Sequence, residues 1–114
     1  MNTTKQLMAD RLLAGETIED YRENGSSMTP IIYSRQPVTI SPVNTDLLEK
    51  RDIVFCRIGQ KFYLHLVTAV EEHQVQISNN KGFVNGYASK ENVFGIVSAV
   101  DGKPRSSAQS KIRK

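Results

Sequence analysis

The residues best suited to catalysis in this chain are a pair of serines and one of its two histidines. Ser26 and Ser27 lie in the stretch GSSMTP at residues 25–30, and His65 lies inside the apolar run KFYLHLVTAV. A serine becomes a nucleophile when a base is within hydrogen-bonding reach and an oxyanion site is near. A histidine held on a rigid strand is a suitable base. The alternative is an ordinary turn serine and a buried, hydrogen-bonded histidine.

The other reactive residue types favour no further chemistry. His73 follows two glutamates at a turn, which indicates an exposed and inert side chain, and Cys56 alternates with apolar neighbours as a small core residue would. A single cysteine gives neither an internal disulfide nor a metal-binding spacing. The stretches IGQK and NNKG lack a phosphate-loop pattern, and no carboxylate pair has apolar neighbours. We therefore expect no cofactor and no metal.

Length and composition are those of a soluble single domain. The chain has 114 residues, of which 39% are hydrophobic and 24% charged. It contains no apolar run long enough for a bilayer, and its first residues lack the apolar core of a secretory signal. We expect a cytoplasmic protein without a membrane partner.

Positive charge is concentrated in the last twelve residues, KPRSSAQSKIRK. Residues 1–102 carry more acidic than basic side chains, so the net charge of +3 comes from the five basic residues of 103–114. With Ile112 as its one large apolar residue, this segment is predicted to be a disordered tail following a domain at 1–102. It is either a weak arm for nucleic acid or another polyanion, or a solubilising terminus.

Short alternating apolar segments dominate the rest of the chain. The pattern predicts one N-terminal helix at about 3–14, ended by Gly15, and a possible short strand within 16–24. Further strands are expected at 37–43, 52–58, 61–70, 73–78 and about 93–100, with a tight hairpin at Gly59–Gln60, a turn or helical turn at 45–50, a bulge or bend at Gly95 and a loop at 79–86. The fold class is mostly β, a β-rich α+β protein with a single, partly closed antiparallel sheet or barrel.

The stretch GSSMTPII resembles the serine box of the LexA-like and signal-peptidase-like serine peptidases. That box runs Gly, any residue, Ser, Met, any residue, Pro and then an apolar residue. Gly25, Ser27, Met28, Pro30 and Ile31 fill these positions.

Downstream segments follow the same family order over roughly residues 16–100. LEKRDIVFCRI resembles the segment that usually has Gly–Asp, with Arg51–Asp52 in its place, and FYLHLV resembles the strand that carries the base. The family has lysine there in bacterial signal peptidases and LexA-type proteins, and histidine in archaeal and endoplasmic-reticulum signal peptidases. His65 occupies this position, with Leu66 in place of the usual arginine. ISNNKGFVNG and FGIV resemble the later Asn–Asn box, at Asn79–Asn80, and the closing strand.

The resemblance implies roles for individual residues. Ser27 would be the nucleophile and His65 the base, while Ser26 or the Ser27 backbone would serve the oxyanion and Met28 would anchor the corner. Asn80 is the second asparagine of the later box. Histidine-type relatives place aspartates just after that box, where this chain has Gly82, Phe83 and Val84, so that Asn85 is the substitute orienter.

The resemblance implies two possible functions. The first is a soluble, stand-alone serine peptidase or hydrolase, similar to small phage or prophage proteins, that acts on a peptide extended along an exposed sheet edge. The second is a non-catalytic protein-binding module of the same fold, a phage accessory or host-interacting protein. A homodimer formed by edge strands is possible. Self-cleavage at Ala14–Gly15 is not expected, because the segment leading to Ser27 is too short to fold back.

Overall fold

Alternating apolar residues fold most of this chain into β-strands, as the sequence predicts. A computed structural model describes residues 3–114. The main elements are α1 (Thr3–Leu13), β1 (Ile18–Arg22), β2 (Pro37–Pro42), β3 (Ile53–Ile58), β4 (Lys61–Val70), β5 (Gln74–Ser78), β6 (Val84–Ser89), β7 (Val93–Val100), β8 (Lys103–Pro104) and α2 (Ser106–Gln109), with 3-10 turns η1 (Thr45–Leu47) and η2 (Lys90–Asn92).

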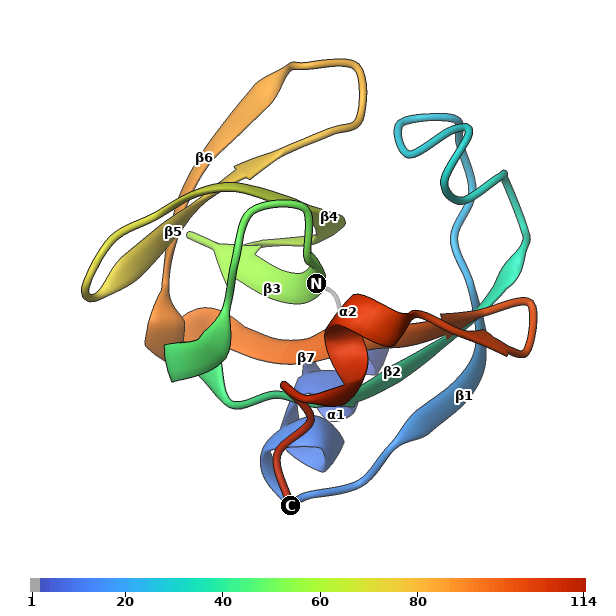
Figure 1. The fold of residues 1–114 in the computed structure, drawn as a ribbon, viewed down its shortest axis with the longest axis horizontal. Helices are drawn as coiled ribbons and strands as arrows, with labels where there is room; N and C mark the ends of the chain where they lie inside the picture. Colours follow the sequence, from blue (N-terminus) through green and yellow to red (C-terminus); the bar gives the residue numbers. More distant parts are fainter. Residues whose placement is uncertain (1–2) are drawn as a thin grey trace.

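All the strands belong to one antiparallel sheet. Its order is β1-β2-β7-β3-β4-β5-β6, with β8 paired to β7, so β1 and β6 are the edges. The sheet curls around itself but is not closed into a barrel, and α1 and α2 lie on different sides of it (Figure 1). The prediction of a β-rich fold with one antiparallel sheet and a short N-terminal helix is confirmed.

The helix α1 packs closely against the sheet at Gly95. A Cβ atom at this position would lie 2.7 Å from Ile40 Cγ2 and 3.0 Å from Leu12 Cδ1, so only glycine lets the helix and strand approach this far. The pairing of β7 with β3 changes register between Phe55 and Cys56, which confirms the bulge or bend predicted at Gly95.

The hairpin β3–β4 forms the centre of the sheet. Its loop begins at Gly59, which has a positive φ of 59° as the predicted tight turn requires. β4 pairs with β3 on one side and β5 on the other, so the interior position predicted from its two apolar faces is confirmed. His65 itself pairs with Val54 of β3, next to the point where the pairing with β5 begins at Leu66 and Ser78.

Strand β6 differs from the prediction, which assigned residues 79–86 to a loop. The strand begins at Val84 and pairs with β5 as an edge strand. Asparagine and glycine dominate this stretch and favour turns, but the β5 edge provides backbone partners that composition does not reveal. The change matters because β6 contains Asn85.

The C-terminal segment is not a disordered tail; that prediction is wrong. β8 pairs with β7, α2 packs on the sheet, and Val43 forms a bridge with Ile112. Ala108 and Lys111 are buried, and Arg113 donates to the carbonyl oxygens of Leu12 and Leu13. The segment is ordered because polar contacts add to its modest apolar burial. A free basic arm for nucleic acid therefore loses its structural basis.

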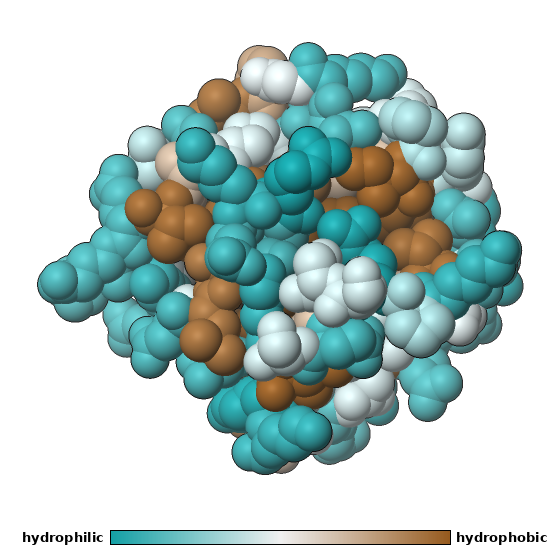
Figure 2. Space-filling view, viewed as in Figure 1, coloured by the Kyte–Doolittle hydropathy of each residue, from teal (hydrophilic) through white to brown (hydrophobic). Residues whose placement is uncertain are grey.

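Residues 3–114 include no helix with both the length and the apolar character needed to cross a membrane. On the face that carries α2, hydrophilic side chains cover the centre, and hydrophobic side chains lie in separate groups around it (Figure 2). The core lies on both sides of the sheet. One apolar cluster includes α1 and the serine corner, and the other lies beneath α2.

Candidate active site

The serine box forms a tight corner between β1 and β2. Gly25 enters it with a positive φ of 106°, a conformation that suits glycine. Met28 is buried in the α1-side core, and its carbonyl oxygen accepts from the backbone N–H groups of Ile31 and Ile32. The methionine therefore anchors the corner in apolar surroundings, as the resemblance implies, and leaves the half-buried Ser27 at the surface.

Ser27 and His65 lie together although 38 residues separate them in the chain. The serine Oγ is 3.1 Å from His65 Nε2. This distance is within the hydrogen-bonding range expected of a nucleophile and its base. The sequence could predict the two residues but not their separation in space, which depends on the loop after β1 reaching β4.

Asn85 orients the histidine from the other side. Its Oδ1 lies 2.7 Å from His65 Nδ1. An amide oxygen can only accept, so Nδ1 carries the proton and Nε2 keeps a free lone pair for the Ser27 hydroxyl. The register of β5 with β6 passes from Ile77↔Gly86 to Ser78↔Val84, which makes Asn85 the extra residue of a bulge. Bulges redirect side chains in this way near functional sites.

The surroundings keep His65 neutral. Burial lowers the pKa of His65 from 6.5, and nearby Lys61 lowers it further. The hydrogen bond that His65 donates to Asn85 and the charge of Glu23 act in the opposite direction but do not cancel the effect of burial. A neutral imidazole at neutral pH is the form that can accept a proton from serine.

Asn80 ties the loop between β5 and β6 to the serine corner. Its backbone N–H donates to Ser27 O at 2.8 Å, and its Nδ2 donates to Thr29 O at 2.9 Å. Asn79 shapes the same loop, because its Oδ1 accepts from the backbone N–H groups of Lys81 and Phe83. Asn80 therefore holds the corner that carries Ser27 through both its backbone and its side chain.

The backbone N–H of Ser27 is available to an anionic oxygen. Within residues 3–114 it donates to no protein acceptor. Ser26 is exposed, its carbonyl oxygen accepts from Thr29, and its Oγ is 3.4 Å from Lys81 Nζ. The sequence suggests either Ser26 or the Ser27 backbone as the oxyanion donor. Of these two, the Ser27 N–H has no protein acceptor, whereas Ser26 Oγ already lies 3.4 Å from Lys81 Nζ.

Several other predicted features lie away from this site. His73 is exposed and contacts Glu72, and Cys56 is fully buried with the pKa of its thiol raised to about 12 by burial. Gly82 and Phe83 are exposed and contribute no group to His65. No cluster of three or more metal-ligating side chains of the His, Cys, Asp or Glu type occurs in the described part of the chain.

Sequence reasoning missed Glu23. This residue lines a small pocket beside Ser27, together with Asn24, Gly25, Met28, Ile32, Tyr33 and Leu64. Its carboxylate accepts from the Tyr21 hydroxyl at 3.2 Å and pairs with Lys5 at 3.5 Å. Glu23 lies in the polar segment 16–24, whose composition is that of an ordinary strand end and does not indicate a place beside Ser27.

No family model, no curated protein and no solved structure matches this chain.

Proposed function

We propose that this chain is a serine hydrolase of the LexA-like and signal-peptidase-like type, which cleaves a peptide bond with Ser27 and His65. The observation that carries the proposal is the continuous line of hydrogen bonds from Ser27 Oγ through the His65 ring to Asn85 Oδ1. A nucleophile, a base and a group that orients the base are the three parts that acyl transfer by serine requires.

The chemistry follows from the positions of the atoms. His65 Nε2 takes the Ser27 proton as Oγ attacks the substrate carbonyl carbon, and the negative oxygen that forms is stabilised by the Ser27 N–H. His65 then gives the proton to the leaving amine, the C–N bond breaks, and an acyl-serine ester remains. Water, deprotonated by the same nitrogen, hydrolyses that ester and restores Ser27. Asn85 keeps the proton of the neutral ring on Nδ1 throughout.

Two edge strands lead to this site. β1 runs into the corner that carries Ser27, and β6 begins beside Asn85. An extended peptide could pair with either edge and place its scissile carbonyl at Ser27. Within the small pocket beside Ser27, the methionine, isoleucine and leucine side chains are apolar, which favours an apolar side chain next to the scissile bond.

A non-catalytic binding module is the second candidate, and Asn85 is the observation that favours it. An amide has no charge with which to stabilise the imidazolium that forms when His65 takes the proton. The same site would then hold a peptide at the sheet edge without cleaving it, and the Ser27–His65 hydrogen bond would only rigidify the corner.

A serine-reactive fluorophosphonate probe separates the two candidates. We expect the wild-type protein to be labelled at Ser27, as read by mass spectrometry of the digested adduct, and Ser27→Ala and His65→Ala to lose this labelling. His73→Ala is the matched control, because His73 is exposed and far from the chemistry. Circular dichroism of each variant checks that the fold is kept.

The result that would overturn the hydrolase assignment is wild-type labelling no faster than that of Ser27→Ala. Full labelling of His65→Ala would show that the histidine is not the base. Peptide-library hydrolysis, read by mass spectrometry of the products, then identifies the bond that is cut.

A further inference from the structure

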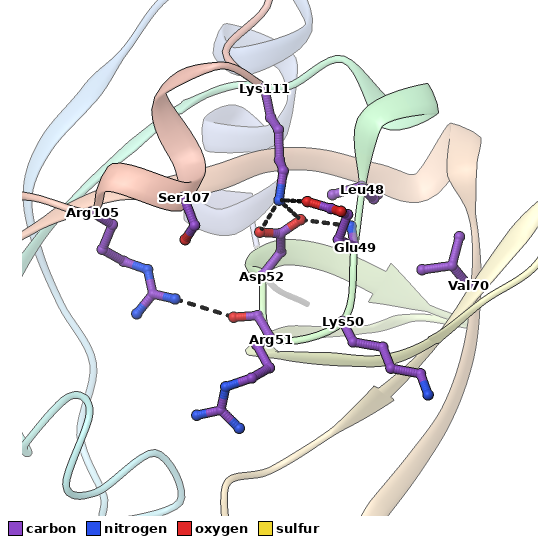
Figure 3. A pocket seen from close by; sticks show the side chains of 9 residues that line it. All are labelled: Leu48, Glu49, Lys50, Arg51, Asp52, Val70, Arg105, Ser107 and Lys111. Atoms are coloured by element: carbon purple, nitrogen blue, oxygen red, sulfur yellow. Dashed lines mark hydrogen bonds and ion pairs between the residues drawn. The ribbon is translucent and has the colours of Figure 1, made fainter.

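A second, larger pocket lies between α2 and the turn that precedes β3, away from the serine corner. It measures about 690 Å³ and opens on the face that carries α2 (Figure 3). Its lining consists of Leu48, Glu49, Lys50, Arg51, Asp52, Val70, Arg105, Ser107 and Lys111. Four of these residues are basic and two are acidic, so the pocket carries excess positive charge.

The acidic side chains of the pocket are already paired with one cation. Lys111 Nζ lies 2.8 and 2.9 Å from the two Asp52 carboxylate oxygens and 2.9 Å from Glu49 Oε1. Lys111 and Asp52 are both buried. This ion pair forms the inner end of the pocket and leaves the other three cations without an acidic partner.

Lys50, Arg51 and Arg105 are those three cations. Within residues 3–114, no carboxylate lies at ion-pair distance from any of them. Arg105 donates one N–H to the Arg51 carbonyl oxygen at 3.1 Å. The two arginines lie on the same side of the pocket, opposite Lys50 (Figure 3). Burial lowers the pKa of Arg105, Asp52 raises it, and the neighbouring Arg51 charge lowers it again. The Arg51 and Lys50 side chains point away from each other (Figure 3), and unpaired cations around one pocket favour an anion that draws them together.

The backbone of Arg51 has a conformation that it shares with Asp20, Arg35 and Asp101 among the non-glycine residues of 3–114. Its φ is 78°, in the left-handed region that suits glycine and is unfavourable for arginine. Such conformations cluster at ligand-binding sites, where a side chain is retained despite the strain. Glycine would form this turn more easily, but it would remove a guanidinium from the rim of the pocket.

We propose that this pocket binds a phosphate monoester dianion. Arg51 and Arg105 would hold two of its oxygens, Lys50 would balance the remaining charge, and the Ser107 hydroxyl would donate to a third oxygen. A dianion suits three cations better than a carboxylate does, and guanidinium groups match phosphate oxygens in a two-pronged manner. Leu48 and Val70 provide an apolar wall for the organic group that carries the phosphate.

The test is a titration followed by amide chemical shifts, with inorganic phosphate, phenyl phosphate and acetate as separate probes at constant ionic strength. We expect both phosphates to shift the amides of Arg51, Arg105 and Ser107 in a saturable manner, and acetate to shift them weakly. Tighter binding of phenyl phosphate would identify an ester as the natural ligand, and equal binding would identify the free ion.

The variants provide the decisive comparison. Arg51→Gln and Arg105→Lys should each weaken phosphate binding by about tenfold. The first variant removes a charge, and the second keeps the charge but loses the paired N–H donors of the guanidinium group. Arg35→Gln is the matched control, since Arg35 is also exposed and has a positive φ of 64°. Arg51→Gly should lose binding with no fall in melting temperature, which excludes unfolding as the cause. Non-saturable shifts, equal effects of acetate, or unchanged binding in both pocket variants would overturn the proposal.

Discussion

His65 Nδ1 lies 2.7 Å from Asn85 Oδ1, although the two residues belong to strands β4 and β6 with β5 between them. The contact exists because the bulge in β6 turns Asn85 towards the histidine. Cysteine–histidine–asparagine sites on other folds place an asparagine in the same position beside the histidine. It fixes the tautomer without adding charge.

Replacing Asn85 tests whether this contact positions the base. Asn85→Ala should lower kcat of hydrolysis, or the fluorophosphonate labelling rate, by about tenfold, because the ring can rotate and change tautomer. Asn85→Asp should instead raise the pKa of His65, because a carboxylate stabilises the charged ring. Ser89→Ala, at the other end of β6, is the control for general disturbance of the strand. Equal rates for wild type and Asn85→Ala would show that Asn85 has no positioning role.

The reaction should lose activity only at acidic pH, below the ordinary pKa of histidine. Burial lowers the pKa of His65 below 6.5, so kcat/KM should rise with pH, reach half its plateau below pH 6.5, and stay flat through neutrality. Since the folded-state pKa is below the unfolded value, protonation favours unfolding, and this residue's contribution to stability is lost as the pH falls below 6.5. A pH–rate profile and a titration of the His65 ring by NMR measure both effects. A midpoint above 6.5 would contradict the burial argument.

Asn80 connects the serine corner to the loop after β5, and its loss should affect stability and activity together. Asn80→Ala removes the Nδ2 donor to Thr29 O but keeps the backbone bond to Ser27 O. We expect a loss of about 1 kcal/mol in the free energy of unfolding, measured by urea denaturation. The rate should fall because Ser27 is less well held, while KM changes little. A variant with wild-type rate would show that the backbone bond alone positions Ser27.

The sequence could predict most of the strands from local patterns, and it could single out Ser27 and His65 from their local context and the family resemblance. Alternation over 61–70 is enough to place His65 on an interior strand, and the GSSMTP corner is compact. The role of Asn85 could be suggested only by its place after the asparagine pair. Its contact depends on the pairing of β6 with β5, and an edge strand rich in turn residues has no clear periodic signal.

The order of the C-terminal segment could not be predicted for a related reason. A prediction of order from composition depends on the number of apolar residues, and residues 103–114 contain few. Its stability depends on Lys111 meeting Asp52, which lies 59 residues earlier in the chain. A buried ion pair between distant residues leaves no trace in local hydropathy, so lysine and arginine near the end of the chain read as a solvated tail.

The buried Lys111–Asp52 pair gives the last prediction. Lys111→Met leaves the Asp52 carboxylate, which is 2% exposed, without its cation, and should lower the free energy of unfolding by about 3 kcal/mol. Lys103→Met is the control, because Lys103 is exposed and pairs with no carboxylate within residues 3–114, and it should change stability by less than about 0.5 kcal/mol.

A double variant separates the two causes of this loss. Lys111→Met with Asp52→Asn should recover part of the stability, because the uncompensated charge is gone while the packing defect stays. Burial lowers the pKa of Lys111, but the hydrogen bonds and charges of Asp52 and Glu49 raise it above 10.5 overall. The contribution of the Lys111 charge is therefore fully present at pH 7 and is lost as the pH rises through that folded-state pKa. Urea denaturation at pH 7 measures all three variants. Equal stability of Lys111→Met and wild type would show that the C-terminal segment is not held by this pair.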